Sequence, residues 1–196
     1  MTERRAEVER ETGETAVHVE VDVDGQGEAD VDTGVGFLDH MLAGFAKHGF
    51  FDVGVDAEGD VDETGDHHTV EDVAITLGMA FDEALGDRAG IRRFGDARAP
   101  MDEALASVVV DVSGRPHTEA DVDLLRSRVA DLSTEMVEHF FSSFAANAGL
   151  TLHVRASGDN DHHVVEAAFK AFALALDEAT AFEGRREGVP STKGEI

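Results

Sequence analysis

The stretch "GDHHTVEDVAI" (residues 65–75) decides the fold, because it recurs later in the chain as "DNDHHVVEAAF" (residues 159–169). Each copy contains two adjacent histidines, and a glutamate follows three positions after the second histidine. The two copies stand 95 positions apart in a chain of 196 residues. A repeat of this kind, at about half the chain length, indicates an internal duplication.

Further segments recur in the same order around these two copies. The matches are "VEVDVDG" (19–25) with "VVVDVSG" (108–114), "FLDHMLAGFA" (37–46) with "MVEHFFSSFA" (136–145), and "DEA" (82–84) with "DEA" (177–179). The second match aligns His40 with His139 at an offset of 99, whereas the first has an offset of 89. The changes in offset indicate insertions in loops. The duplication predicts two half-domains, residues 1–95 and 96–196.

Each half shows the same succession of periodicities. Alternation of apolar and polar residues predicts half-buried strands, and apolar residues at helical spacing predict amphipathic helices. In the first half we expect strands at 16–25 and 28–32, a helix at 37–47, a strand at 50–57 and a helix at 69–85. In the second half we expect strands at 108–114 and 117–124, a helix at 134–146, a strand at 150–156 and a helix at 164–180.

The expected order is therefore β-β-α-β-α, twice. We expect the second strand of each half to pair with the first after a turn, and the helices to cover one face of a mainly antiparallel or mixed sheet. This arrangement is an α+β fold. Asp66 and Asp161 stand just before the two paired histidines and are the expected N-caps of the long helices.

The composition limits the partners and the kinds of site. The chain has 42 Asp+Glu against 16 Lys+Arg, a formal net charge of -26, which disfavours nucleic acid and anionic membranes. With no long apolar run and no apolar segment after the charged start, we expect a cytoplasmic protein. Cysteine is absent, so any metal must bind nitrogen and oxygen ligands. The excess of acids also leads to the hypothesis of a chain that works in concentrated salt.

The repeated histidines and glutamates have the spacing of metal ligands. Neighbouring residues on a helix point about 100° apart, so the two histidines of a pair should serve different sites. A glutamate three or four positions further on shares a face with one of them and can bind the same ion. The equivalent histidines of the preceding helices raise the candidate ligands to six histidines and two glutamates: His40, His67, His68, Glu71, His139, His162, His163 and Glu166.

This set divides into two sites of about three histidines and one glutamate, each with open coordination positions. Such ligands suit Mn²⁺, Fe²⁺, Co²⁺ or Zn²⁺, and open positions are what a catalytic metal needs. Cations are scarce in this chain, so Arg93, Arg115, Lys170 and Lys193 stand out as candidates for binding a phosphate group.

At these residues the sequence resembles the imidazoleglycerol-phosphate dehydratase family of histidine biosynthesis. The resemblance is carried by "RETGET", "DTGVGFLDHMLAGFAKHG", "GDHHTVEDVAI", "GIRRFG", "APMDEAL", "VDVSGRP", "EHFFSSFA", "GDNDHHVVEAAFKAFALAL" and "PSTKG", in this order. It implies two half-domains packed as an α/β sandwich of the ribosomal protein S5 domain 2-like type. It also implies a site with two Mn²⁺ ions between subunits, and trimers built into an assembly of 24 subunits.

The resemblance assigns roles to individual residues. It implies that all eight candidate ligands bind metal, and that Arg93, Arg115, Lys170, Ser191 and Lys193 hold the substrate phosphate. Glu14 matches a family glutamate that approaches the substrate diol. Glu14 or a metal-bound water is the candidate acid/base group, and Glu71 and Glu166 join Glu14 among the candidate catalytic residues.

The implied reaction dehydrates imidazoleglycerol phosphate to imidazole-acetol phosphate. Metal coordination would favour the imidazolate form of the substrate ring, whose electrons can expel hydroxide. A dinuclear metallohydrolase that cleaves a phosphate ester would use the same ligands and stays an alternative, as does a non-catalytic metal-storage shell.

Overall fold

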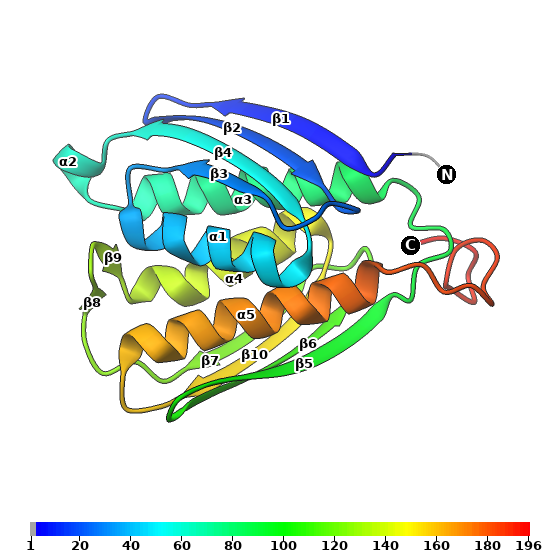
Figure 1. Cartoon of the computed structure of the whole chain (residues 1–196). Helices are drawn as coiled ribbons and strands as arrows, with labels where there is room; N and C mark the ends of the chain where they lie inside the picture. Colours follow the sequence, from blue (N-terminus) through cyan, green and yellow to red (C-terminus); the bar gives the residue numbers. More distant parts are fainter. Residues whose placement is uncertain (1–2) are drawn as a thin grey trace.

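The computed structural model describes residues 3–196 and contains two four-stranded sheets with helices between them (Figure 1). The first half comprises β1 (Arg5–Glu11), β2 (Thr15–Asp22), β3 (Ala29–Asp32), α1 (Gly36–Gly49), β4 (Asp52–Gly59), α2 (Val61–Thr64) and α3 (His67–Leu85). The second half comprises β5 (Phe94–Met101), β6 (Ala104–Asp111), β7 (His117–Val122), β8 (Arg128–Val129), β9 (Leu132–Ser133), α4 (Glu135–Ala148), β10 (Thr151–Ser157) and α5 (Asp161–Thr180). The α+β class and the duplicated organisation are confirmed.

The two sheets have the same topology. Their strand orders are β1-β2-β4-β3 and β5-β6-β10-β7, antiparallel except for the last pair of each sheet. Our pairing of the second predicted strand with the first was wrong, because β3 and β7 pair in parallel with β4 and β10 instead. Both sides of β2 are already occupied, by β1 and β4, so β3 can join the sheet only at its far edge.

Each half begins with one strand more than we expected. β1 has the sequence "RAEVERE" and β5 has "FGDARAPM", and both lie at a sheet edge. Most of their inward positions carry small or charged residues, such as Ala6, Arg10 and Gly95, and Val8 is the one β-branched residue among them. Pro100 fits an edge strand, since an edge residue need not donate to a neighbour.

The core lies where the helices of the two halves meet. α1 packs against α5 and α3 against α4, so each contact joins one half to the other. Phenylalanines fill this space: Phe45 of α1 stacks on Phe172 of α5 at 5.4 Å between ring centroids, and Phe81 of α3 meets Phe144 of α4 at 5.4 Å. All four side chains are buried, and each contributes roughly 1.5–3 kcal/mol.

Two buried aspartates fasten the starts of the histidine-bearing helices. The N-cap of α5 is Asn160, whose side chain accepts a hydrogen bond from the His162 N–H, so our assignment of Asp161 as the cap was wrong. Asp161 instead accepts hydrogen bonds from the N–H groups of Leu125 and Arg126 at 3.0 and 2.9 Å.

Asp66 does stand at the N-cap position of α3, but its side chain makes no capping bond there. Its carboxylate accepts from the backbone N–H and from the hydroxyl of Ser133, the latter at 2.7 Å. Asp66 and Asp161 therefore use their carboxylates in the same way, to tie a loop of the second half to the first turn of a long helix. Within residues 3–196, no helix combines the length and the apolar character needed to cross a membrane.

Candidate active site

The two histidines of each pair point in different directions, as the helical spacing predicts. The ring planes of His67 and His68 meet at 80°, with centroids 5.9 Å apart, and those of His162 and His163 meet at 89°, with centroids 6.1 Å apart. Each pair therefore serves two different surroundings.

His162 faces a histidine from the other half of the chain. His162 Nε2 lies 3.2 Å and His40 Nε2 3.3 Å from the same oxygen, Glu166 Oε2. We call His40, His162 and Glu166 the first donor group. The other oxygen of Glu166 lies 2.6 Å from Lys170 Nζ. Burial acts to raise the pKa of Glu166, but the hydrogen bond and charge of Lys170 outweigh burial and lower it.

The second donor group is the counterpart of the first with the halves exchanged. It consists of His67 and Glu71 on α3 and His139 on α4. His139 Nε2 lies 3.0 Å from Glu71 Oε1, and the rings of His67 and His139 have centroids 5.2 Å apart. In both groups, one histidine comes from one half, while the other histidine and the glutamate come from the other half.

Both donor groups have the chemistry and spacing of a divalent-cation site. In each group one atom of each residue lies within 4.8 Å of the others. Ligands about 2.1 Å from one ion lie roughly 3–4 Å apart, which matches the observed separations of 3.0–3.3 Å. The histidines are partly exposed, at 53% for the His40 side chain and 37% for His139, which leaves a side open for substrate.

His68 and His163 do not join these groups within the chain. His68 Nδ1 lies 3.0 Å from Asp60 Oδ2 and 3.7 Å from Glu14 Oε2, and His163 Nδ1 lies 2.9 Å from Glu103 Oε2. The hydrogen bond to Asp60 raises the pKa of His68, and the one from His163 lowers the pKa of Glu103. One chain therefore assembles two groups of two histidines and one glutamate, where we expected three histidines in each.

Glu14 borders a hollow beside His68. The hollow has a volume of about 490 Å³, and its lining includes Glu14, Gly59 and Asp60. The turn that carries Glu14 is fixed to α3, because the hydroxyl of the next residue, Thr15, donates a hydrogen bond to the buried carboxylate of Asp72. A substrate group in this hollow would meet the Glu14 carboxylate, whose side chain is 57% exposed.

Three of the four candidate cations lie far from both donor groups. Arg93 donates from its backbone N–H to Ala179 O at the end of α5, and its guanidinium binds Asp111 at 2.6 and 3.0 Å and Pro190 O at 2.8 Å. The hydrogen bond with Asp111 raises the pKa of Arg93. Arg115 follows Gly114, which packs against the C-terminal Ile196.

Through Pro190 and Ile196, Arg93 and Arg115 thus lie beside the C-terminal tail, which also carries Ser191 and Lys193. Figure 1 shows this tail in red at the right. The donor groups lie at the opposite end, where α1, α3 and α5 begin. The stretch of α5 from Glu166 to Ala179 is about 20 Å long at about 1.5 Å per residue. Only Lys170 lies beside a donor group.

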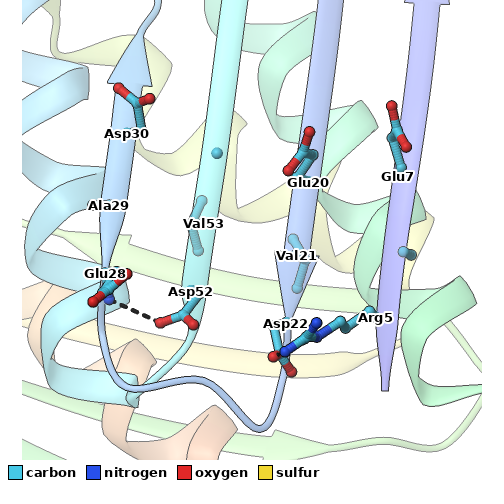
Figure 2. A pocket seen from close by; sticks show the side chains of 12 residues that line it. Arg5, Glu7, Glu20, Val21, Asp22, Glu28, Ala29, Asp30, Asp52 and Val53 are labelled. Carbon is cyan, nitrogen blue, oxygen red and sulfur yellow. Dashed lines mark hydrogen bonds and ion pairs between the residues drawn. The ribbon is translucent and has the colours of Figure 1, made fainter. Parts of the chain in front are cut away.

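A hollow larger than the one beside Glu14 lies elsewhere. It has a volume of about 730 Å³ and lies on the outer face of the first sheet, where Figure 2 shows Arg5 directed to Asp22, and Asp52 bonded to the segment at Glu28. Its described lining contains no histidine and no predicted site residue. We therefore do not assign this acidic hollow to the candidate active site.

Sequence reasoning missed two carboxylates that contact the site histidines, Asp60 and Glu103. A signal for Glu103 was present, because the offset of 89 that relates Gly25 to Gly114 also relates Glu14 to Glu103. No such signal existed for Asp60, which stands in a connection, residues 60–66, that is shorter in the second half, at residues 158–160.

Comparison with known proteins gives one consistent result. Residues 33–176 match the family described as imidazoleglycerol-phosphate dehydratase. Curated proteins of that name from Haloarcula marismortui and Halobacterium salinarum are each 55% identical to this chain, with 100% of both chains covered. The crystal structure of imidazoleglycerol-phosphate dehydratase from Staphylococcus aureus superposes with a TM-score of 0.82 at 38% identity, covering 91% of this chain and 99% of that one. The structure from Pyrococcus furiosus, in complex with (S)-C348, gives 0.83 at 36%, covering 96% and 100%.

Proposed function

Because the chain belongs to the imidazoleglycerol-phosphate dehydratase family, we propose that it dehydrates imidazoleglycerol phosphate with two Mn²⁺ ions per active site, held between subunits. As a member of this family it is a hydro-lyase of histidine biosynthesis, which sets aside hydrolysis of a phosphate ester as its reaction. The observation that carries the metal proposal is the pair of equivalent donor groups, each with converging imidazoles and a carboxylate.

The first donor group would hold one ion and the second donor group another. His68 and His163 point away from these groups and would complete the coordination of ions held by neighbouring subunits. When bound, Mn²⁺ would supply Lewis-acid stabilisation of the imidazolate form of the substrate ring, the form whose electrons can expel hydroxide. The open sides of the donor groups leave room for the substrate imidazole, and Glu71 and Glu166 hold the histidines that surround it.

Glu14 is the proposed acid/base group. Its carboxylate borders a hollow beside His68, so a substrate diol placed there lies within reach of a carboxylate that can accept or return a proton. Thr15 and Asp72 keep the turn in place, which favours a defined position of Glu14 against the substrate.

The phosphate would bind the cations of the tail end. Arg93 and Arg115 offer forked donors, and Ser191 and Lys193 add a hydroxyl and a point charge. Because this end lies about 20 Å from the chain's own donor groups, phosphate and metals can meet one small substrate only if they come from different subunits. The geometry thus supports a composite site, for which we propose trimers assembled into 24 subunits, in the cytoplasm.

Turnover of imidazoleglycerol phosphate tests this function. We expect ketone formation without release of inorganic phosphate, loss of turnover after removal of metal, and its return with Mn²⁺. His40→Ala should lower kcat/KM by at least about 100-fold, since a Lewis acid contributes several kcal/mol to the transition state. The matched control is His153→Ala, which removes an exposed histidine of β10 outside the donor groups. Release of phosphate, or full turnover by His40→Ala, would refute the proposal.

A further inference from the structure

The two halves present a turn glutamate to the second histidine of each pair. Glu14 stands in the turn between β1 and β2, and its repeat equivalent Glu103 stands in the turn between β5 and β6. Glu14 faces His68 and Glu103 faces His163. The duplication therefore offers two versions of the same contact, and the versions differ.

In the second half, Glu103 is engaged by both of its oxygens. Oε2 lies 2.9 Å from His163 Nδ1, and Oε1 accepts a hydrogen bond from the Asn160 N–H at 2.9 Å. The His163 side chain is 23% exposed and that of Glu103 is 35% exposed, so water competes only in part for this bond. A carboxylate bound to Nδ1 fixes the ring and leaves Nε2 as the nitrogen with a free lone pair.

In the first half, Asp60 has taken over this contact. His68 Nδ1 lies 3.0 Å from Asp60 Oδ2, whereas Glu14 Oε2 stays at 3.7 Å, beyond hydrogen-bond range. Asp60 belongs to the longer connection between β4 and α3, and its side chain is 19% exposed. Glu14 is left without the tie that holds Glu103, and it borders the hollow.

From this pair of contacts we propose that Asp60 and Glu103 are positioning residues. Each holds Nδ1 of its histidine, His68 or His163, so that Nε2 of the same ring is directed at a metal ion. In the first half Asp60 replaces the turn glutamate in this contact, which leaves Glu14 free for the substrate. The inference rests on the proposed function, because it takes the two histidines to be metal ligands. Carboxylates that bind the second nitrogen of a metal-bound histidine commonly change metal affinity 10–100-fold when they are removed.

The asymmetry explains why one fold needs both arrangements. A glutamate tied to a histidine and to a backbone N–H, as Glu103 is, cannot also approach a substrate hydroxyl without giving up these bonds. A short aspartate from another segment can fix His68 without using the turn glutamate. Each composite site would then obtain two fixed histidines and one unengaged glutamate.

The test measures the Mn²⁺ affinity of the full-length assembly for wild type and five variants. Mn²⁺ is titrated into each assembly, and the concentration of free ion is read by electron paramagnetic resonance. Asp60→Ala and Glu103→Ala remove the acceptor and should weaken the affected site about 10–100-fold. Asp60→Asn and Glu103→Gln keep an oxygen acceptor and should restore most of the affinity. Asp102→Asn, next to Glu103 but 82% exposed and 4.0 Å from His163, is the control and should match wild type.

Melting temperatures without metal separate positioning from folding. Glu103→Ala also loses the bond to Asn160 and should lower stability slightly, by about the value of one hydrogen bond. Among the described residues, the Asp60 carboxylate accepts no hydrogen bond from the backbone N–H of another residue. Asp60→Ala should therefore weaken Mn²⁺ binding without a matching fall in melting temperature. In steady-state assays Asp60→Ala should need more Mn²⁺ for half-maximal turnover, while Glu14→Gln should lower kcat at unchanged Mn²⁺ affinity.

Three results would overturn the inference. Wild-type affinity in both alanine variants would show that neither carboxylate positions a ligand. Glu103→Gln binding as poorly as Glu103→Ala would make Glu103 a metal ligand itself. A wild-type assembly that binds no Mn²⁺ would refute the inference together with the proposed function, whereas the first two results leave the dehydration and its metals intact.

Discussion

Two impaired variants should restore activity to one another when they assemble together. Glu166→Gln damages the first donor group, and Lys193→Ala removes a cation from the tail at the other end of the chain. Each variant alone should be strongly impaired. Loss of a charged contact to phosphate costs about 1.5–3 kcal/mol, or roughly 10–100-fold in kcat/KM.

The size of the recovery follows from the separation of the two groups along α5. If a site takes its first donor group from one subunit and its tail from another, co-expression in equal amounts leaves half of the donor groups and half of the tails intact. About one quarter of the sites then have both, so we expect about one quarter of wild-type kcat/KM in a randomly mixed oligomer. If both parts came from one chain, every site would carry a defect and recovery would be absent.

The assay is ketone formation at substrate concentrations below KM, on assemblies purified with two different tags. The control is co-expression of Glu166→Gln with His162→Ala, which damage the same donor group of the same chain and should not complement. Activity no greater than the sum of the two single variants would refute the composite site. Recovery in the control would instead show that a donor group can itself form between chains.

Three further outcomes are expected. Gly78→Ala should destabilise the fold by about 1–3 kcal/mol, because a Cβ there would lie 2.6 Å from Phe144 O where α3 crosses α4. The control is Gly44→Ala on α1, whose Cβ would meet nothing within 4 Å and which should stabilise the fold by about 0.5–1 kcal/mol. Equal thermal midpoints of the two variants would contradict this account of the packing. Raising salt from low to molar concentration should raise the melting temperature, since screening weakens the repulsion of a net charge of -26, and a fall would remove the hypothesis of a salt-adapted chain. The hydrogen bond from Arg4 lowers the pKa of Asp24. The stability lost in Asp24→Asn should therefore be largest above a pH of about 3.9 and should vanish as the pH falls through the lowered pKa. The measurement is the unfolding free energy of both proteins as a function of pH, and a difference that stays constant with pH would contradict this expectation.

Most of the fold could be predicted, because the repeat and the periodicity carry it. Helices α1, α3, α4 and α5 and strands β2, β4, β6 and β10 lie within a few residues of their expected positions. The edge strands β1 and β5 were not predicted, because most of their inward residues are small or charged and their register depends on a neighbouring strand. The order of the strands in each sheet was not predicted either, because alternation of apolar and polar residues indicates a strand but not the strand it pairs with. The division between residues 95 and 96 stays a prediction.

Part of the site could be predicted from the sequence alone. Helical spacing predicts that His67 and Glu71 share a face, and the repeat adds His139 as a third donor. It could not show that His68 and His163 lie outside the groups, because ring direction depends on what each ring meets in three dimensions. Asp60 could not be predicted for the same reason, since it contacts His68 from the connection between β4 and α3, which is longer than its counterpart in the second half.

The exchange of ligands between the halves limits how such a protein could have arisen. Neither half carries all three donors of one group. Each half contributes one histidine, on α1 or α4, to one donor group, and a histidine with a glutamate, on α3 or α5, to the other donor group. An ancestor of half this length could therefore have captured a cation only as a self-paired dimer, with its phenylalanines closing the seam. Fusion of two such copies would join partners already dependent on one another, and it would leave each copy free to change by itself.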